Sequence, residues 1–84
     1  MNGDGSVIVA GTPAHSHGRA FIPIVLQSVL ACEHGAVISV VPIGIYVVDH
    51  QIEYYYPLTG DEPDFEKVER LAEILQNERE RSVN

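Results

Sequence analysis

Short apolar runs, separated by glycine, proline and polar residues, set the pattern of this chain. The runs over residues 6–11 and 36–41 are rich in β-branched side chains and are typical of buried strands. Residues 45–49 and 52–56 form two further apolar runs, and the polar pair between them predicts a tight turn near His50-Gln51. The pattern therefore predicts four strands, of which the last two form an antiparallel hairpin.

Between the first two of these strands, residues 19–34 have the spacing of a helix. Apolar residues recur at intervals of three and four and fall on one helical face: Ile22, Val25, Leu26, Val29 and Leu30. Pro23 fits only near the start of such a helix, and Gly35 is placed to cap its end. Because the opposite face is also largely apolar, this helix needs cover on both sides, and we expect a second subunit to provide it.

The C-terminal part predicts a second helix. Asp61 or Glu62, followed by Pro63, would start it, and its apolar residues again share one face: Phe65, Val68, Leu71, Ala72 and Leu75. The predicted order is β-α-β-β-β-α, an α/β fold whose mixed sheet has one parallel crossover and an antiparallel hairpin. Residues 1–84 would form a single compact domain, with residues 1–5 and 78–84 frayed.

Charge and cysteine content narrow the classes of function. The formal net charge of −7 argues against binding to bulk DNA or RNA, which requires a basic surface. No apolar run approaches the roughly 20 residues that cross a bilayer, and no signal peptide is evident, so we expect a cytoplasmic protein without membrane contact. Cys32 is the single cysteine, which rules out an intrachain disulfide and favours a small buried apolar side chain.

The segment Gly11–Arg19 is the most informative one for chemistry. In the predicted fold it connects the first strand to the first helix, the edge at which open α/β sheets bind ligands. A helix N-terminus there could bind a phosphate, and the residues we expect to contact such a ligand are Thr12, Ser16, Gly18 and Arg19. The segment matches neither a Walker loop nor a dinucleotide-binding fingerprint, and an exposed connecting loop is an equal alternative.

Three histidines are candidates for catalysis: His15, His17 and His34. Histidine titrates near neutral pH and can act as a general base or a metal ligand. His15-x-His17 can hold one metal when extended, and further donors in the chain are Cys32, Glu33, His34, Asp49 and His50. Their spacing defines no metal site, so no cofactor is assigned and a divalent metal such as manganese stays open. His34 could equally cap the predicted helix.

One stretch resembles a known family. Residues 34–50 run His34, an apolar strand, Pro42-Ile-Gly44, a second apolar strand and His50, and residues 7–13 run from a strand into Gly11-Thr-Pro13. This order resembles the small CRISPR-associated ring nucleases, which degrade cyclic oligoadenylate. The family has an aspartate where this chain has Val41, a proline–glycine spacing one residue longer, and a β-rich N-terminal portion without counterpart here.

The resemblance implies a small homo-oligomer that binds, and in the fullest case cleaves, a cyclic oligonucleotide signal in antiviral defence or its evasion. In an oligomer, Arg19 would be repeated around the ligand, which would offset the acidic charge of the chain. The alternative from another class is a non-enzymatic protein–protein interaction module, such as a phage-encoded inhibitor or an antitoxin-like partner. A metal-dependent enzyme acting on another substrate is a third hypothesis.

Overall fold

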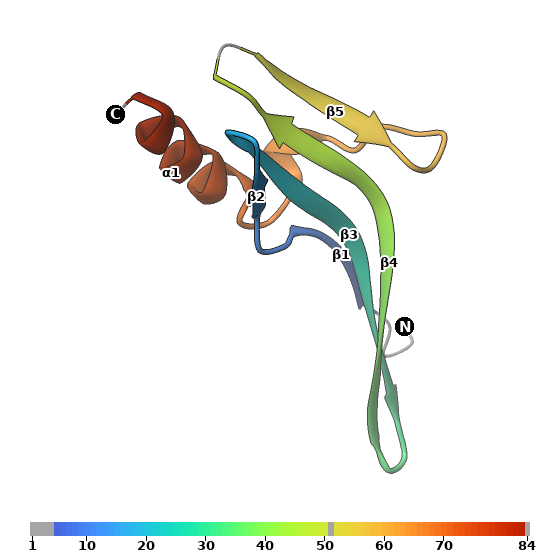
Figure 1. Ribbon diagram of the computed structural model, residues 1–84. Helices are drawn as coiled ribbons and strands as arrows, with labels where there is room; N and C mark the ends of the chain where they lie inside the picture. The colour runs from blue at the N-terminus through green and yellow to red at the C-terminus, as the bar shows by residue number, and fades with distance from the viewer. Residues whose placement is uncertain (1–4, 51, 84) are drawn as a thin grey trace.

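The computed structural model describes residues 5–50 and 52–83 and shows a curled, all-antiparallel sheet followed by one C-terminal helix (Figure 1). The strands are β1 (Gly5–Ala10), β2 (Ala14–Ser16), β3 (Arg19–Cys32), β4 (Gly35–Val48) and β5 (Glu53–Pro57). They lie in the order β1-β3-β4-β5, and β2 also pairs with β3. The expected α/β fold with a parallel crossover is therefore wrong, because no pair of these strands runs parallel.

The prediction of a helix over residues 19–34 is wrong, because residues 19–32 form strand β3. Its apolar residues satisfy helical spacing, but they also occupy alternate positions: Ala20, Ile22 and Ile24 are buried and point to one face. The segment is rich in isoleucine and valine, whose branched Cβ restricts rotamers in a helix and packs well on a pleated surface. Gly35 accordingly follows a hairpin turn and caps no helix.

Pro23 marks a break in the sheet rather than the first turn of a helix. Ile24 pairs with Ala10 at the end of β1, and Phe21 pairs with Ala14 at the start of β2, so Pro23 lies opposite the gap between these two strands. The position that lacks an N–H faces this gap and not β4, so the β3–β4 ladder loses no hydrogen bond. Its carbonyl oxygen still accepts one, from the Gly11 N–H at 2.8 Å.

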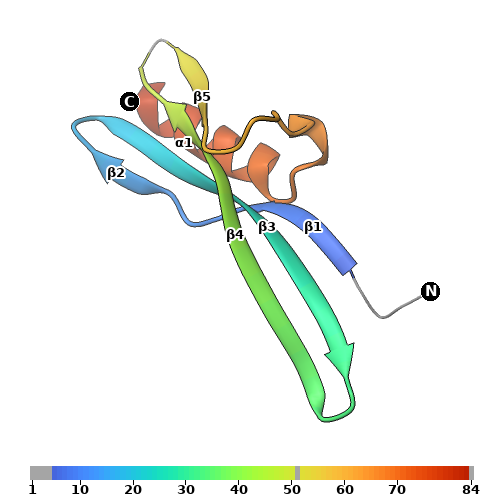
Figure 2. The same cartoon turned by 90° about the vertical axis from the view of Figure 1, so that its right-hand side faces the viewer.

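A bulge bends β4 at the point where the sheet leaves the core. Ile24 pairs with Gly44 but Val25 pairs with Pro42, so Ile43 is the extra residue on β4. Beyond the bulge, residues 25–42 of β3 and β4 continue as a long hairpin, which we call the arm. Strand β1 pairs with its first part, residues 25–29, and the rest of the arm is two-stranded. The two views show it projecting away from the helix (Figures 1 and 2). The molecule is consequently elongated, with extents of 50 × 25 × 21 Å.

Helix α1 (Leu71–Val83) covers the end of the sheet opposite the arm. Its buried residues recur at helical spacing (Leu71, Ile74, Leu75 and Glu78), and the first three pack in a cluster with side chains of the sheet: Ala10, Ala20, Ile22, Ile24 and Val48. This helix is neither long nor apolar enough to cross a membrane, and it is the only α-helix in the described ranges.

The predicted C-terminal helix is confirmed in type but begins later than expected. Residues 65–67 form a short 3₁₀ helix, η1 (Phe65–Lys67), whose N-cap is Asp64. Arg70 then adopts a left-handed conformation with φ 71°, which separates η1 from α1. Of the predicted apolar face, Val68, Leu71 and Leu75 are buried, whereas Ala72 is exposed.

The strand predictions are confirmed as strands but differ in burial. Residues 6–11 fall largely within β1, and the predicted C-terminal hairpin is β4 paired with β5. The two strands predicted at 36–41 and 45–49 are one continuous strand, β4. The run 36–41, however, is exposed throughout rather than buried. At the ends, β1 includes Gly5 and α1 extends to Val83, whereas residues 1–4 and 84, where fraying was expected, lie outside the described residues.

Candidate functional site

A polar pocket lies at the end of the sheet opposite the arm. It has a volume of about 220 Å³ and is formed by β2, the β2–β3 turn, the ends of β3 and β4, and helix α1. Its lining residues are His15, Gly18, Arg19, Ala20, Val48, Asp49, His50, Glu78 and Arg81. Segments distant in the sequence thus bring two histidines, two arginines and two carboxylates together.

The β2–β3 turn sets one wall of this pocket. Ser16 pairs with Arg19, which leaves a two-residue loop of His17 (φ 55°) and Gly18 (φ 78°). Two successive positive φ angles make a type I′ turn, whose twist matches the strands it joins. Any side chain at Gly18 would meet the His50 imidazole, because a Cβ there would lie 3.1 Å from its Nε2. Glycine at this position therefore brings the turn close to His50.

Glu78 is the deepest ionisable group of the pocket. Its carboxylate is buried on α1, and His15 Nε2 lies 3.0 Å from both of its oxygens. A buried carboxylate requires such a partner because it has lost its hydration. The His15–Glu78 pair therefore fixes β2 against the helix as well as lining the pocket.

The opposite wall holds a second ion pair. Arg19 Nε donates to Asp49 Oδ2 at 3.1 Å, and the His50 backbone N–H donates to Asp49 Oδ1 at 2.6 Å. The bond from the His50 backbone, followed by that from Arg19, holds the pKa of Asp49 below its ordinary value. Asp49 is thus a carboxylate at neutral pH, and it neutralises the charge of Arg19.

The pocket is therefore lined by two pairs of side chains, His15–Glu78 and Arg19–Asp49, together with His50 and Arg81. This arrangement can hold a small polar group, but it presents little excess positive charge. Among the described residues, no group of three or more histidine, cysteine, aspartate or glutamate side chains is arranged to hold a metal ion.

Three of the predicted site residues meet in this pocket, and four do not. His15, Gly18 and Arg19 line it, and Thr12 lines an adjacent depression that shares His15 and Glu78. His17 lies in the turn and is exposed, with its Nδ1 2.9 Å from Ser16 Oγ. Ser16 and His17 are both exposed to solvent, and neither lines the pocket.

His34 lies far from the other histidines. It is in the two-residue turn at the tip of the arm, with a 94% exposed side chain 3.7 Å from Glu33. From Arg19 to Cys32 the strand has thirteen residue steps, or about 43 Å at ~3.3 Å per step. His15, His17 and His34 therefore do not converge within one copy of the chain. Cys32, next to this turn, is exposed rather than buried.

Sequence reasoning missed Glu78 and Arg81 as pocket residues because it assigned them to a frayed end. A signal for Glu78 was present: it follows Leu71 by seven residues, Ile74 by four and Leu75 by three, and so continues the apolar face of the helix. A carboxylate in that phase is placed to face the sheet, where it needs a partner.

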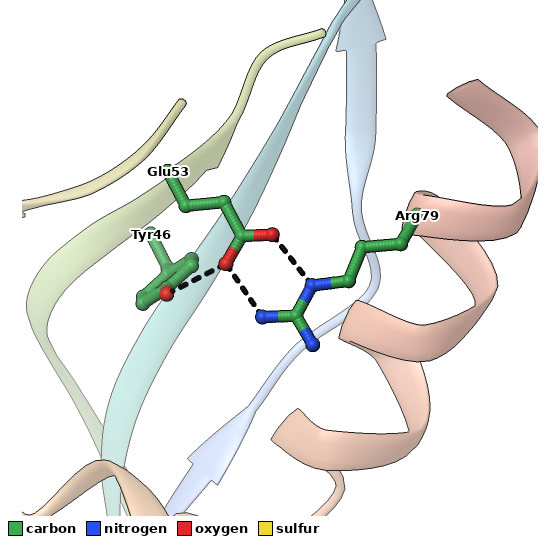
Figure 3. Close-up of polar contacts among 3 residues, drawn as sticks. All are labelled: Tyr46, Glu53 and Arg79. Carbon is green, nitrogen blue, oxygen red and sulfur yellow. Dashed lines mark hydrogen bonds and ion pairs between the residues drawn. The ribbon is translucent and has the colours of Figure 1, made fainter. Parts of the chain in front are cut away.

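A second polar cluster joins the helix to the β4–β5 hairpin (Figure 3). Arg79 donates to both oxygens of Glu53, through Nε and Nη2 at 2.6 Å each, and the Tyr46 hydroxyl donates to Glu53 at 3.1 Å. The Arg79 bond holds the pKa of Glu53 below its ordinary value. Partial burial, together with Glu53, raises the pKa of Tyr46. This cluster is a structural clamp, since its polar groups are engaged with one another.

The arm carries the most conspicuous surface of the molecule. Its large aliphatic side chains are about half exposed or more: Leu30, Val37, Ile38, Val40 and Val41. They lie on both faces, because Val37 and Val41 alternate with Ile38 and Val40 along β4. From residue 20 to residue 48 the only ionisable side chains besides cysteine and tyrosine are Glu33 and His34, both in the tip. The strands of the arm are therefore apolar and uncharged.

Comparisons with known proteins add no identification: no protein-family model, curated protein or solved structure matches this chain.

Proposed function

We propose that this protein is a non-enzymatic interaction module whose contact element is the arm. The observation that carries this proposal is a long hairpin whose two strands carry no charge and expose aliphatic side chains on both faces. Exposed apolar surface of this kind is costly in water and is characteristic of protein interfaces. The sequence already suggested such a module, on the basis of a predicted apolar helix over residues 19–34 and of the tyrosine-rich strand 52–56. Residues 25–34 of that predicted helix belong to the arm.

The shape of the chain supports the same function. Its radius of gyration is 14.8 Å, compared with about 12 Å for a compact domain of this length. The arm accounts for the difference, because the sheet and helix at its base form the only hydrophobic core of the described residues. A hairpin that leaves its own core gains stability when another chain covers it. The single exposed Cys32 on this hairpin suits a reducing compartment such as the cytoplasm.

Site-specific photocrosslinking in the producing cells tests this function. A photoreactive amino acid at Ile38, on the arm, should give protein adducts that mass spectrometry identifies. The same amino acid at Leu58 is the matched control, since Leu58 is similarly exposed but lies outside the arm. Adducts at position 38 that exceed those at position 58 would support the proposal, and equal or absent adducts at position 38 would refute it.

Binding of a cyclic oligonucleotide is a second candidate, favoured by one observation. His15, Gly18 and Arg19 share the polar pocket with Arg81, which gives a phosphate group two guanidinium neighbours. Against cleavage, His34 and His50 flank opposite ends of β4 and cannot act together within one copy. Incubation with labelled cyclic oligoadenylates, with and without manganese, decides the matter. Retention lost in the Arg19→Ala variant supports binding, whereas no retention removes this candidate.

A further inference from the structure

Among the residues that the structure describes, no strand pairs with the outer edge of β4 along the arm. The carbonyl of Pro23 accepts the Gly11 N–H, so odd-numbered residues of β3 direct their backbone groups toward β1. Even-numbered residues of β3 then face β4, because these directions alternate in an antiparallel ladder. Leu26, Ser28 and Leu30 pair with Val41, Ser39 and Val37. The remaining residues of the β4 arm direct their backbone groups away from β3: Ala36, Ile38 and Val40.

This edge has defined limits. On one side it ends at Gly35 beside the turn, and on the other at Pro42, which has no N–H to donate. Beyond Pro42 the edge is occupied, since β5 pairs with β4 from Gly44 onward. The available edge is therefore three outward-facing residues centred on Ile38, without a charge, a proline or a bulge to protect it. Natural edge strands normally carry such protection.

The edge is complementary to itself. Two β4 edges paired antiparallel about a two-fold axis at Ile38 place Ala36 opposite Val40 of the second copy and Ile38 opposite Ile38 of the second copy. All three outward residues of each copy then donate and accept hydrogen bonds, and Pro42 falls outside the pairing. A two-fold axis makes the same patch serve both copies, as in most homodimers.

The acidic charge of the chain does not oppose a second copy arranged in this direction. Each chain carries a net charge of −7, yet only Glu33 and His34 of the arm are ionisable besides Cys32. When the arms overlap antiparallel, the acidic parts of the two chains, which lie outside the arms, are at opposite ends of the sheet that the two copies share. From Ile38 at the axis to Gly44, where β5 begins to pair, there are six residue steps, or about 20 Å at ~3.3 Å per step. The parts of the two copies that lie outside the arms are therefore about 40 Å apart at their nearest ends. That separation is several times the roughly 8–10 Å over which salt screens exposed charges.

The accessible surface of the chain is larger than that of a compact protein of the same mass. The accessible surface is 6039 Å², whereas a compact protein of this mass exposes about 4,900 Å². The excess of about 1,100 Å² exceeds the roughly 800 Å² that each partner contributes to an interface of standard size. The chain thus exposes more additional surface than an interface of standard size requires.

We infer that the partner of the arm is a second copy of this chain, paired antiparallel through the β4 edge about Ile38. This inference rests on the proposed interaction function and names its partner. The pairing would join two curled sheets into one continuous sheet, with Ile38 of both copies in contact at the axis and Val37 beside Ser39 of the other copy on the opposite face.

Sedimentation equilibrium of the purified chain tests the inference. The wild-type protein should sediment with twice the 9.2 kDa mass of one chain. Ile38→Lys would place two ammonium groups at the axis and should weaken dimerisation at least tenfold. Ile52→Lys makes the same substitution at a similarly exposed site at the other end of the sheet and should leave dimerisation within twofold. A monomeric wild type, or equal weakening by both variants, would overturn the inference.

Disulfide formation tests the register independently. In a Cys32→Ser background, Ile38→Cys should oxidise to a covalent dimer, because directly opposite Cα atoms lie about 5.5 Å apart, within disulfide range. Val41→Cys is the control, since Val41 faces Gly35 of the second copy and the two introduced thiols lie about 20 Å apart. Equal oxidation at both positions would overturn the register. A monomeric chain that still gives photoadducts with a different protein at position 38 would remove the second copy while retaining the interaction function.

Discussion

The His15–Glu78 pair allows a sharp test of how the pocket end of the fold is held together. His15→Ala removes the partner that lies 3.0 Å from both oxygens of Glu78. Glu78 stays on α1 with 8% of its surface exposed, among the core residues Ile74 and Leu75. The variant must therefore either leave a carboxylate poorly solvated or move the end of the helix to hydrate it.

The structure sets the expected size of the effect. Loss of a charge-assisted hydrogen bond to a buried carboxylate costs about 1.5–3 kcal/mol of unfolding free energy. In a domain of this length, 1 kcal/mol changes Tm by roughly 4–8 °C, so the midpoint should fall by about 6–24 °C. Thermal unfolding followed by circular dichroism measures this change, at one fixed protein concentration because dimerisation would shift Tm.

A matched histidine and a double variant complete the experiment. His17→Asn is the control, since His17 is exposed and asparagine tolerates its positive φ, and it should change stability by less than about 0.5 kcal/mol. Glu78→Gln removes the buried charge, so combining it with His15→Ala should cost less than the two single changes added together. A His15→Ala variant as stable as His17→Asn, with additive single effects, would refute the structural role of the pair.

Two further changes test other contacts. Gly44→Ala should destabilise the fold by about 1–3 kcal/mol, because the new methyl group would overlap the Tyr55 ring, whose hydroxyl donates to the Ile43 carbonyl. Urea unfolding measures this change, and an unchanged midpoint would contradict the packing of Tyr55 against Gly44. Glu53→Gln should cost about 1 kcal/mol at neutral pH. Since Arg79 lowers the pKa of Glu53, this contribution should be complete above about pH 4.5 and should disappear as the pH falls through the lowered value. A wild type and variant that differ equally at acidic and neutral pH would contradict the clamp of Figure 3.

The local pattern predicted most strands and the type of the C-terminal helix, but not the fold class. The decisive segment was 19–34, in which apolar residues are so dense that they fit a period of 3.6 as well as a period of 2. Pro23 was compatible with both structures, at a helix start or opposite a gap between strands. What separates them is pairing with β1 and β4, a long-range interaction that no local spacing encodes.

Burial was predicted less well than secondary structure. The uninterrupted apolar run 36–41 is typical of a strand covered on both faces. With residues 19–34 in the sheet, one helix is left to cover it, and α1 covers only the end where Ala20 and Val48 lie. The same apolar pattern therefore describes an exposed arm. The expectation of a second subunit rests on the all-round apolar character of residues 19–34. Ala20, Ile22 and Ile24 are covered by the core, so this argument applies to the part of the segment that lies in the arm.

The site was predictable in part. His15, Gly18 and Arg19 were selected because they lie in one polar loop, and the β2–β3 turn does place them together. His34 was selected for its chemistry and for its place in the stretch that resembles the ring nucleases, and a fourteen-residue strand separates it from the pocket.

Residue-resolved amide hydrogen exchange of the arm tests the central claim most directly. In an isolated chain the amides of β4 would alternate, with protection at Val37, Ser39 and Val41, which face β3, and rapid exchange at Ala36, Ile38 and Val40. Pairing with a second copy predicts that all six are protected, and that Ile38→Lys restores the alternation. Rapid exchange at Ala36, Ile38 and Val40 in the wild-type protein, at concentrations where its mass is measured, would contradict the account.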